Sequence, residues 1–89
     1  MKFNIPGFED KFRRIARTLE LKEETGEAVV NYLFALNSSI NIPHRLREIN
    51  VKAEHLDTLA DLAFADFAHP NNPKPVSRDD FKNLYSQAL

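Results

Sequence analysis

The feature that most constrains this chain is its longest apolar stretch, residues 25–40, TGEAVVNYLFALNSSI. On a helix that advances by about 100° per residue, one stripe collects four of its side chains, those of Val29, Leu33, Leu36 and Ile40. Other apolar side chains widen this stripe well past half of the helix surface. A helix that is apolar most of the way round is normally buried on several sides. The sequence therefore predicts a central helix over residues 25–40, with the other helices packed around it.

Capping residues delimit several of the predicted helices. Thr25 is an expected N-cap of the central helix, and Asn41 tolerates the left-handed conformation that often follows a helix. Asn50 stands after a shorter helix, where glycine is common. Residues 77–80, SRDD, have the spacing of a capping box. A last helix should therefore begin at Ser77.

Three further segments have helical periodicity. In residues 8–19 the apolar side chains would lie in a narrow stripe on one side of a helix, beside a basic face. The pattern of residues 43–49 indicates a short helix of two turns. In residues 53–68 the apolar side chains would cover a wide arc of a helix. No segment is a convincing strand. The sequence therefore predicts an all-α fold, a compact bundle of four to five short helices in a single helical domain over residues 1–89.

The length and net charge of the chain argue against several classes of function. The chain has 89 residues and a formal net charge of −1, which gives no support for binding nucleic acid or an anionic membrane. Two acidic residues reduce the net positive charge of the first helix. We therefore interpret its basic side as a solvent-exposed face rather than a phosphate-binding patch. No run has membrane-spanning length, and residues 1–10 have no apolar signal core. We expect a soluble, cytoplasmic protein with neither a nucleic-acid nor a membrane partner.

The sequence contains no convincing catalytic constellation. It has no cysteine and only two glycines, so it lacks a thiolate nucleophile and a glycine-rich phosphate loop. His44, His55 and His69 do not have metal-ligand spacing. Asp57 and Asp61 share one helix face, and we interpret them as solvent-facing. We expect no catalytic, cofactor-binding or metal-binding residue in this chain.

Asp66 is the one polar residue in an awkward position. Its helical angle places it within the apolar arc of the fourth helix, in a last turn where the helix dipole disfavours an acid. A carboxylate there needs a partner, either N–H groups of the following loop or an arginine. We expect Asp66 to hold the loop over residues 69–75, HPNNPKP, rather than to contact a substrate.

Three pieces of the sequence together resemble a known family. They are residues 42–51, IPHRLREINV, then Asp66 followed by Asn72-Pro73, and finally residues 77–89, SRDDFKNLYSQAL. In this order and spacing they resemble the C-terminal end of the iron-containing alcohol dehydrogenase family, and the resemblance covers essentially the whole chain. Asn50 is a small departure, because relatives usually have glycine there.

The resemblance implies a dinucleotide-binding domain followed by a helical domain, of which this chain would be the end. In such enzymes one Asp and three His hold a divalent metal, usually iron, while hydride passes to or from NAD(P). The family's metal ligands and cofactor-binding glycines all lie before the position that matches Met1, so none is carried over. The loop at residues 69–73 approaches the substrate pocket in relatives. The resemblance thus implies His69 as a pocket-wall candidate and four structural residues, Asp66, Asn72, Pro73 and Ser77.

Two functions are open at this point. In the first, the chain is the C-terminal portion of an iron-containing alcohol dehydrogenase, and it is inert without the remainder of that enzyme. In the second, it is a stand-alone interaction module derived from the family. Such a module would bind a partner helix or self-associate through exposed apolar faces that include Val30, Phe34 and Leu62.

Overall fold

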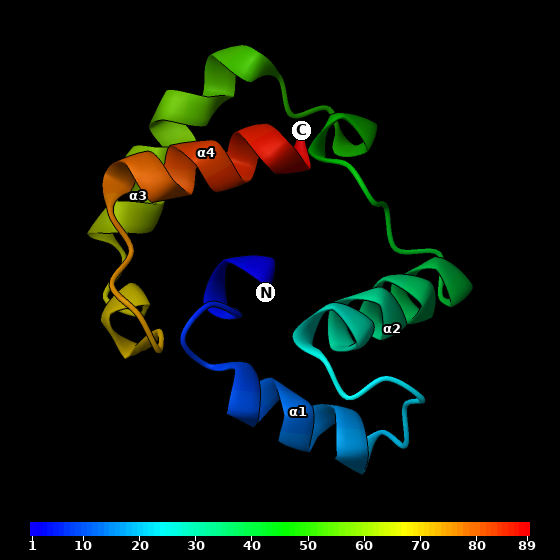
Figure 1. Ribbon diagram of the computed structural model, residues 1–89. Helices are drawn as coiled ribbons and strands as arrows, with labels where there is room; N and C mark the ends of the chain where they lie inside the picture. Colours follow the sequence, from blue (N-terminus) through cyan, green and yellow to red (C-terminus); the bar gives the residue numbers. More distant parts are fainter. The chain divides into compact units, whose positions relative to one another are not determined.

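The structure is a computed structural model that describes all 89 residues, and it consists of helices and connecting loops without a strand (Figure 1). The all-α prediction is therefore confirmed. The chain divides into two compact units, residues 1–42 and residues 43–89, and the single helical domain stays a prediction. None of the helices combines the length and the apolar character that crossing a membrane requires.

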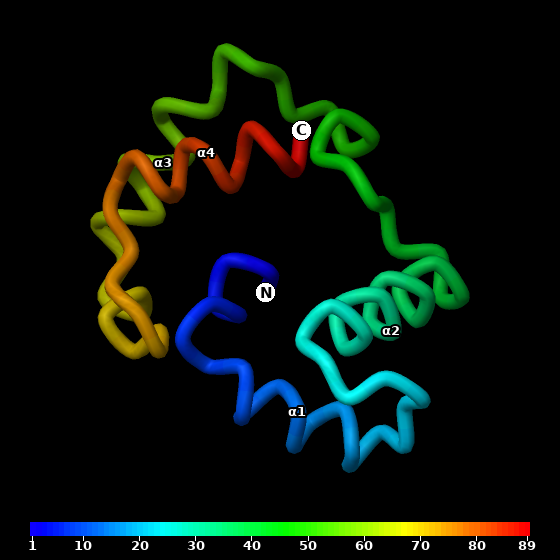
Figure 2. The backbone as a smooth tube through the Cα atoms, in the orientation of Figure 1, coloured from blue at the N-terminus to red at the C-terminus, as the bar shows by residue number.

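The first unit contains a short 3₁₀ helix and two α-helices: η1 is Lys2–Asn4, α1 is Glu9–Thr18 and α2 is Gly26–Ser39. Both η1 and α1 pack against α2, and the backbone trace shows the turn that leads from η1 into α1 (Figure 2). Packing joins side chains from both α-helices into one small core, which consists of Phe12, Ala16 and Val29.

The ends of α2 follow the signals in the sequence. The hydroxyl of Thr25 accepts a hydrogen bond from the Ala28 N–H at 3.1 Å, which satisfies one of the free amides of the first turn. Asn41 has a φ of 61°, the left-handed conformation expected after this helix. Both capping predictions are confirmed.

The burial of α2 is limited within the first unit. Only Gly26 and Val29 of this helix are buried, whereas Phe34 is 57% exposed and Leu36 is 44% exposed. Within the first unit, the helices that pack on α2 are α1 and η1, and both are short. The first unit by itself therefore leaves much of the apolar surface of α2 uncovered, because a broad apolar surface in the sequence does not by itself supply the partners that bury it.

The second unit contains two α-helices and three 3₁₀ helices: η2 is Leu46–Ile49, η3 is Ala53–His55, α3 is Leu56–Ala65, η4 is His69–Asn71 and α4 is Arg78–Ala88. The two α-helices lie against each other (Figure 1). Leu56 and Ala60 of α3 are buried. The Arg45 side chain donates a hydrogen bond to the Gln87 carbonyl at 3.0 Å, so a cation lies at the C-terminal end of α4, where the helix dipole favours it.

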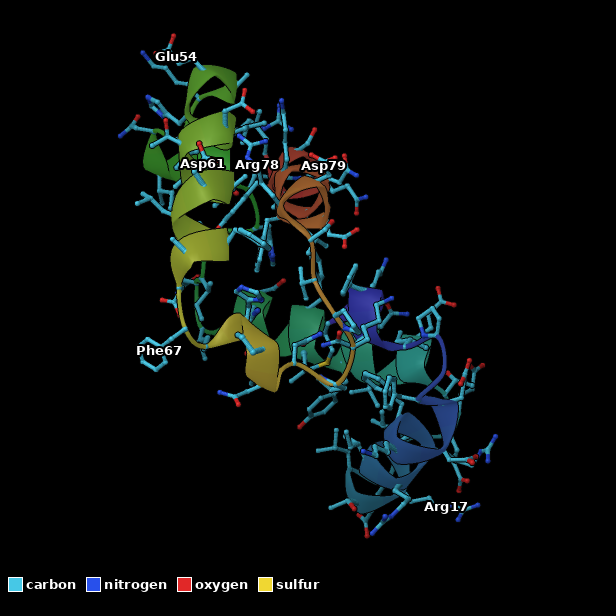
Figure 3. All side chains as sticks on the ribbon, turned by 90° about the vertical axis from the view of Figure 1, so that its left-hand side faces the viewer. Arg17, Glu54, Asp61, Phe67, Arg78 and Asp79 are labelled. Atoms are coloured by element: carbon cyan, nitrogen blue, oxygen red, sulfur yellow. The ribbon has the colours of Figure 1, made fainter.

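Two predicted helices of this unit are shorter in the structure. The expected helix over residues 43–49 is reduced to the 3₁₀ helix Leu46–Ile49, which ends at Asn50 with a left-handed φ of 66°. The expected helix over residues 53–68 ends at Ala65, because Asp66 turns to an extended conformation with φ −68° and ψ 136°. As a result Phe67 lies outside the helix and projects away from the ribbon, with 89% of its surface exposed (Figure 3).

Candidate functional site

Two hollows in the second unit meet at His69. The first has a volume of about 460 Å³ and lies between α3 and α4; it is lined by apolar Leu59, Leu62 and Phe81 and by polar Asp66, His69 and Tyr85. The second has a volume of about 470 Å³ and is formed by the loop itself, with His69, Asn72 and Pro73 in its wall. An apolar hollow with a few polar groups is the usual form of a small-molecule site.

Three contacts hold the imidazole of His69. Its ring stacks on Phe64 with centroids 5.2 Å apart, and the edge of Phe81 approaches it at 5.6 Å. Its Nε2 lies 2.9 Å from the Phe64 carbonyl oxygen. Because a carbonyl oxygen only accepts hydrogen bonds, the Nε2 carries the hydrogen and donates it. The ring is therefore fixed in position between α3 and α4.

Asp66 shapes the loop that carries His69. Its carboxylate accepts a hydrogen bond from the Ala68 N–H at 2.7 Å, so the structure provides the first of its two predicted kinds of partner. This bond closes a short turn directly after α3, as aspartates often do. Further along, the Asn72 side-chain amide donates to the Lys74 carbonyl at 2.8 Å.

The loop ends at a complete capping box. The Asp80 N–H donates to the Ser77 hydroxyl at 3.1 Å, and the Ser77 N–H donates to the Asp80 carboxylate at 2.9 Å. The predicted start of the last helix at Ser77 is thereby confirmed. Hydrogen bonds from the backbone N–H and the hydroxyl of Ser77 hold the pKa of the Asp80 carboxyl below its usual range.

A charged cluster joins α3 to α4 on the solvent side. Arg78 donates to the Asp61 carboxylate through Nε and lies 3.3 Å from the Asp57 carboxylate, and Lys82 Nζ lies 2.8 Å from the same oxygen of Asp57 (Figure 3). Hydrogen bonds from Lys82, which has the larger effect, and from Arg78 lower the pKa of the Asp57 carboxyl. A hydrogen bond from Arg78 lowers the pKa of the Asp61 carboxyl. Both carboxylates are exposed, as the sequence predicted, and the structure shows that they serve as partners for α4.

The residues of this chain do not fit a metal centre. No group of three His, Cys, Asp or Glu side chains is placed to hold a metal ion. The Nδ1 of His55 accepts a hydrogen bond from the Lys52 N–H at 3.1 Å, and the Nε2 of His69 is hydrogen-bonded to the Phe64 carbonyl oxygen. A metal-dependent reaction would need ligands from outside these 89 residues.

Comparison with known proteins identifies the family. The sequence pattern of the Fe-containing alcohol dehydrogenase family, C-terminal, matches residues 1–89. The chain belongs to the Fe-containing alcohol dehydrogenase family. It is 34% identical to lactaldehyde reductase from Escherichia coli strain K12 over 94 residues, which cover 99% of this chain and 25% of that protein.

Two other relatives are more distant. Alcohol dehydrogenase 4 from Saccharomyces cerevisiae strain S288c is 29% identical, over 93% of this chain and 22% of that protein. NADPH-dependent butanol dehydrogenase from Clostridium saccharobutylicum is 24% identical, over 96% of this chain and 24% of that protein. The chain thus spans about a quarter of the length of the curated relatives it matches.

The resemblance named His69 as a pocket-wall candidate, but it named none of the side chains that surround it. The structure brings His69 together with Phe64, Phe81 and Tyr85, which the sequence indicated only as apolar helix positions. Their meeting depends on how α3 and α4 pack, and no local pattern encodes that contact. Helical spacing does show that Phe81 and Tyr85, four residues apart, share one apolar face of the last helix, but it does not show that this face meets His69.

Proposed function

We propose that this chain is the last part of the helical domain of a larger iron-containing alcohol dehydrogenase. The whole enzyme would interconvert alcohols with aldehydes or ketones by transferring hydride to or from NAD(P). The metal, usually iron in this family, and the nucleotide would be held by the rest of the enzyme, which is also the partner that we propose for this chain. We further propose a cytoplasmic location.

One observation carries this proposal: the family pattern matches the chain from end to end, yet the chain covers only about a quarter of its relatives. The exposed apolar side chains support it, because Leu62 is 64% exposed and Phe67 is 89% exposed. Monomeric soluble proteins rarely expose contiguous apolar patches larger than a few hundred Å², so several such side chains together would suit a covered surface.

Within the enzyme, the second unit would supply part of the substrate pocket. The proposed wall residue is His69, whose ring is held by Phe64 and Phe81 at the meeting point of the two hollows. Four residues would have structural roles around it: Asp66, Asn72, Pro73 and Ser77. The hydrogen bonds of Asp66, Asn72 and Ser77 support these roles.

The proposal predicts that the chain alone is inactive. Purified chain, supplied with Fe²⁺, NAD⁺ or NADP⁺ and a panel of alcohols, should form no reduced nucleotide. A chimera in which this chain replaces the matching quarter of the E. coli lactaldehyde reductase should fold and form it. Robust activity of the chain alone, or a folded chimera without activity, would contradict the proposal.

The alternative function is a stand-alone module that self-associates or binds a partner helix through its apolar faces. The exposure of Phe34, 57%, and of Leu62, 64%, favours it equally. Immunoblotting of lysate from the source cells separates the two functions. A band several times heavier than 10.2 kDa supports the dehydrogenase, and a band only at 10.2 kDa supports the module.

A further inference from the structure

A hollow of about 410 Å³ lies along one face of α1, and five residues line it: Lys11, Arg14, Ile15, Thr18 and Leu19. Their spacing of i, i+3, i+4, i+7 and i+8 places all five on one side of the helix. Phe12 and Ala16, which α1 buries in the core shared with α2, are not among them. The first unit therefore leaves this face of α1 open.

Part of this face is apolar. Ile15 is 42% exposed, and Leu19 is partly exposed. They lie four positions apart, about one helical turn, so their side chains are neighbours on the helix surface. The Thr18 hydroxyl already donates to the Arg14 carbonyl at 3.0 Å, so its hydrogen is in use. The face thus offers a partner a small apolar surface.

Two cations without an ion pair belong to the same face. Lys11 and Arg14 are exposed, and the Lys11 ammonium lies 5.3 Å from the centre of the Phe8 ring. The other two basic residues of α1 are both paired with acids, Arg13 with Asp10 at 2.7 Å and Arg17 with Glu24 at 2.6 Å. The group that suits Lys11 and Arg14 is therefore a carboxylate, which binds such cations through charge-assisted hydrogen bonds.

We propose that this face of α1 binds an acidic amphipathic helix of a separate partner protein. The apolar side chains of that helix pack on Ile15 and Leu19, and its carboxylates pair with Lys11 and Arg14. An apolar centre with charged groups beside it is the usual composition of an interface between proteins that also exist apart. The inference does not depend on which of the two functions above is correct.

Other occupants suit this face less well. Permanent burial in a larger enzyme suits the apolar surfaces at Phe34 and Leu62 better, because lysine and arginine are rarely buried unless paired. A second copy would have to offer an acidic helix, but Asp57 and Asp61 of α3 already pair with cations of α4. A membrane surface needs a larger apolar face and more unpaired cations than α1 supplies.

The test measures how a fluorescein-labelled synthetic helix binds the 89-residue chain, by fluorescence anisotropy. The probe has leucine at positions i, i+3, i+4 and i+7 with glutamate beside them, and a control peptide has glutamine in place of every glutamate. The acidic probe should bind more tightly than the control, and added salt should weaken its binding. Lys11→Ala combined with Arg14→Ala should weaken it about three- to tenfold, as the loss of two exposed ion pairs does.

A matched variant guards against a general effect of charge. Arg13→Ala combined with Arg17→Ala removes the same charge from the same helix, but at positions that are already paired, so it should change the affinity much less. Ile15→Ser should weaken the binding of both peptides, because both use the apolar contact. Circular dichroism checks that every variant remains helical. In the ¹⁵N-labelled chain, the backbone signals that move on binding should be those of α1.

Four outcomes would overturn the inference. The first is equal affinity for the acidic and the glutamine peptide, or an equal loss in the two double variants. The second is movement of the signals around Phe34 or Leu62 in place of those of α1. The third is binding to the 89-residue chain but not to the folded chimera with E. coli lactaldehyde reductase, which would mean that the rest of the enzyme covers α1. The fourth is self-association in sedimentation that Lys11→Ala with Arg14→Ala abolishes, which would assign the face to a second copy.

Discussion

Ile5 lies directly against the backbone of Gly26, the first residue of α2. A Cβ atom added to Gly26 would lie 2.9 Å from both Cγ atoms of Ile5, closer than real Cβ contacts. The segment before α1 is thereby seated on the start of α2, next to the Thr25 cap. Glycine is needed here for close approach rather than for an unusual backbone conformation.

Gly26→Ala should therefore destabilise the chain by about 1–3 kcal/mol through overpacking. The usual helix preference of alanine, at most about 1 kcal/mol, acts in the opposite direction. Urea unfolding followed by circular dichroism gives the free energy of unfolding. In an Ile5→Ala background the same substitution should become neutral or stabilising, and an equal loss in both backgrounds would show that the contact is not the cause.

Ser77→Ala should lower the free energy of unfolding by about 1 kcal/mol, because it removes the oxygen that accepts the Asp80 N–H. Ser86→Ala, on the exposed side of the same helix, is the matched control and should change stability by less than about 0.5 kcal/mol. Thermal melting of both variants measures the difference. Equal melting temperatures would mean that the cap does not stabilise α4.

Asn50→Ala should cost about 1 kcal/mol, since alanine is strained at the left-handed φ of 66° that Asn50 adopts. Asn50→Gly should be neutral or stabilising, because glycine adopts this conformation without strain. Asn83→Ala, inside α4, is a control that should be nearly neutral or slightly favourable. Chemical denaturation of the three variants tests the order, and a loss at Asn50→Gly would refute the explanation.

Acid should weaken the contact between α3 and α4. The pKa values of Asp57 and Asp61 are lowered in the folded chain by Lys82 and Arg78, so the stability these carboxylates contribute is present above their unfolded pKa of about 3.9. It is lost as the pH falls below that value through the lowered folded pKa. Urea midpoints measured from pH 5 to pH 2 should decline, and Arg78→Gln should flatten the decline. An unchanged slope in that variant would exclude the cluster as its origin.

The sequence predicted where helices begin and end better than it predicted which other elements cover them. Thr25, Asn41, Asn50 and Ser77 all act as expected, because capping is decided by a residue and its immediate neighbours. The end of α3 was predicted too late, since the periodicity through Phe67 outweighed the turn-forming tendency of Asp66. Periodicity records which residues are apolar, and it does not show whether any element covers them.

The candidate site was predictable only in part for the same reason. The resemblance alone named His69 as a candidate, and its contact with Phe81 spans twelve positions and requires α3 and α4 to pack. The partnership of Asp61 with Arg78 across the two helices likewise depends on tertiary structure. These pairings have no signature within either helix alone.

The hydrogen bonds of the loop after α3 have a consequence for how such enzymes diversify. Asp66 binds Ala68, His69 binds Phe64 and Asn72 binds Lys74, so each bond joins residues at most five positions apart. A loop whose shape depends mainly on hydrogen bonds between its own neighbouring residues can be transferred from one protein to another. It can be exchanged between members of a family as one short unit, provided that the flanking helices keep the aromatic rings of Phe64 and Phe81 that hold His69.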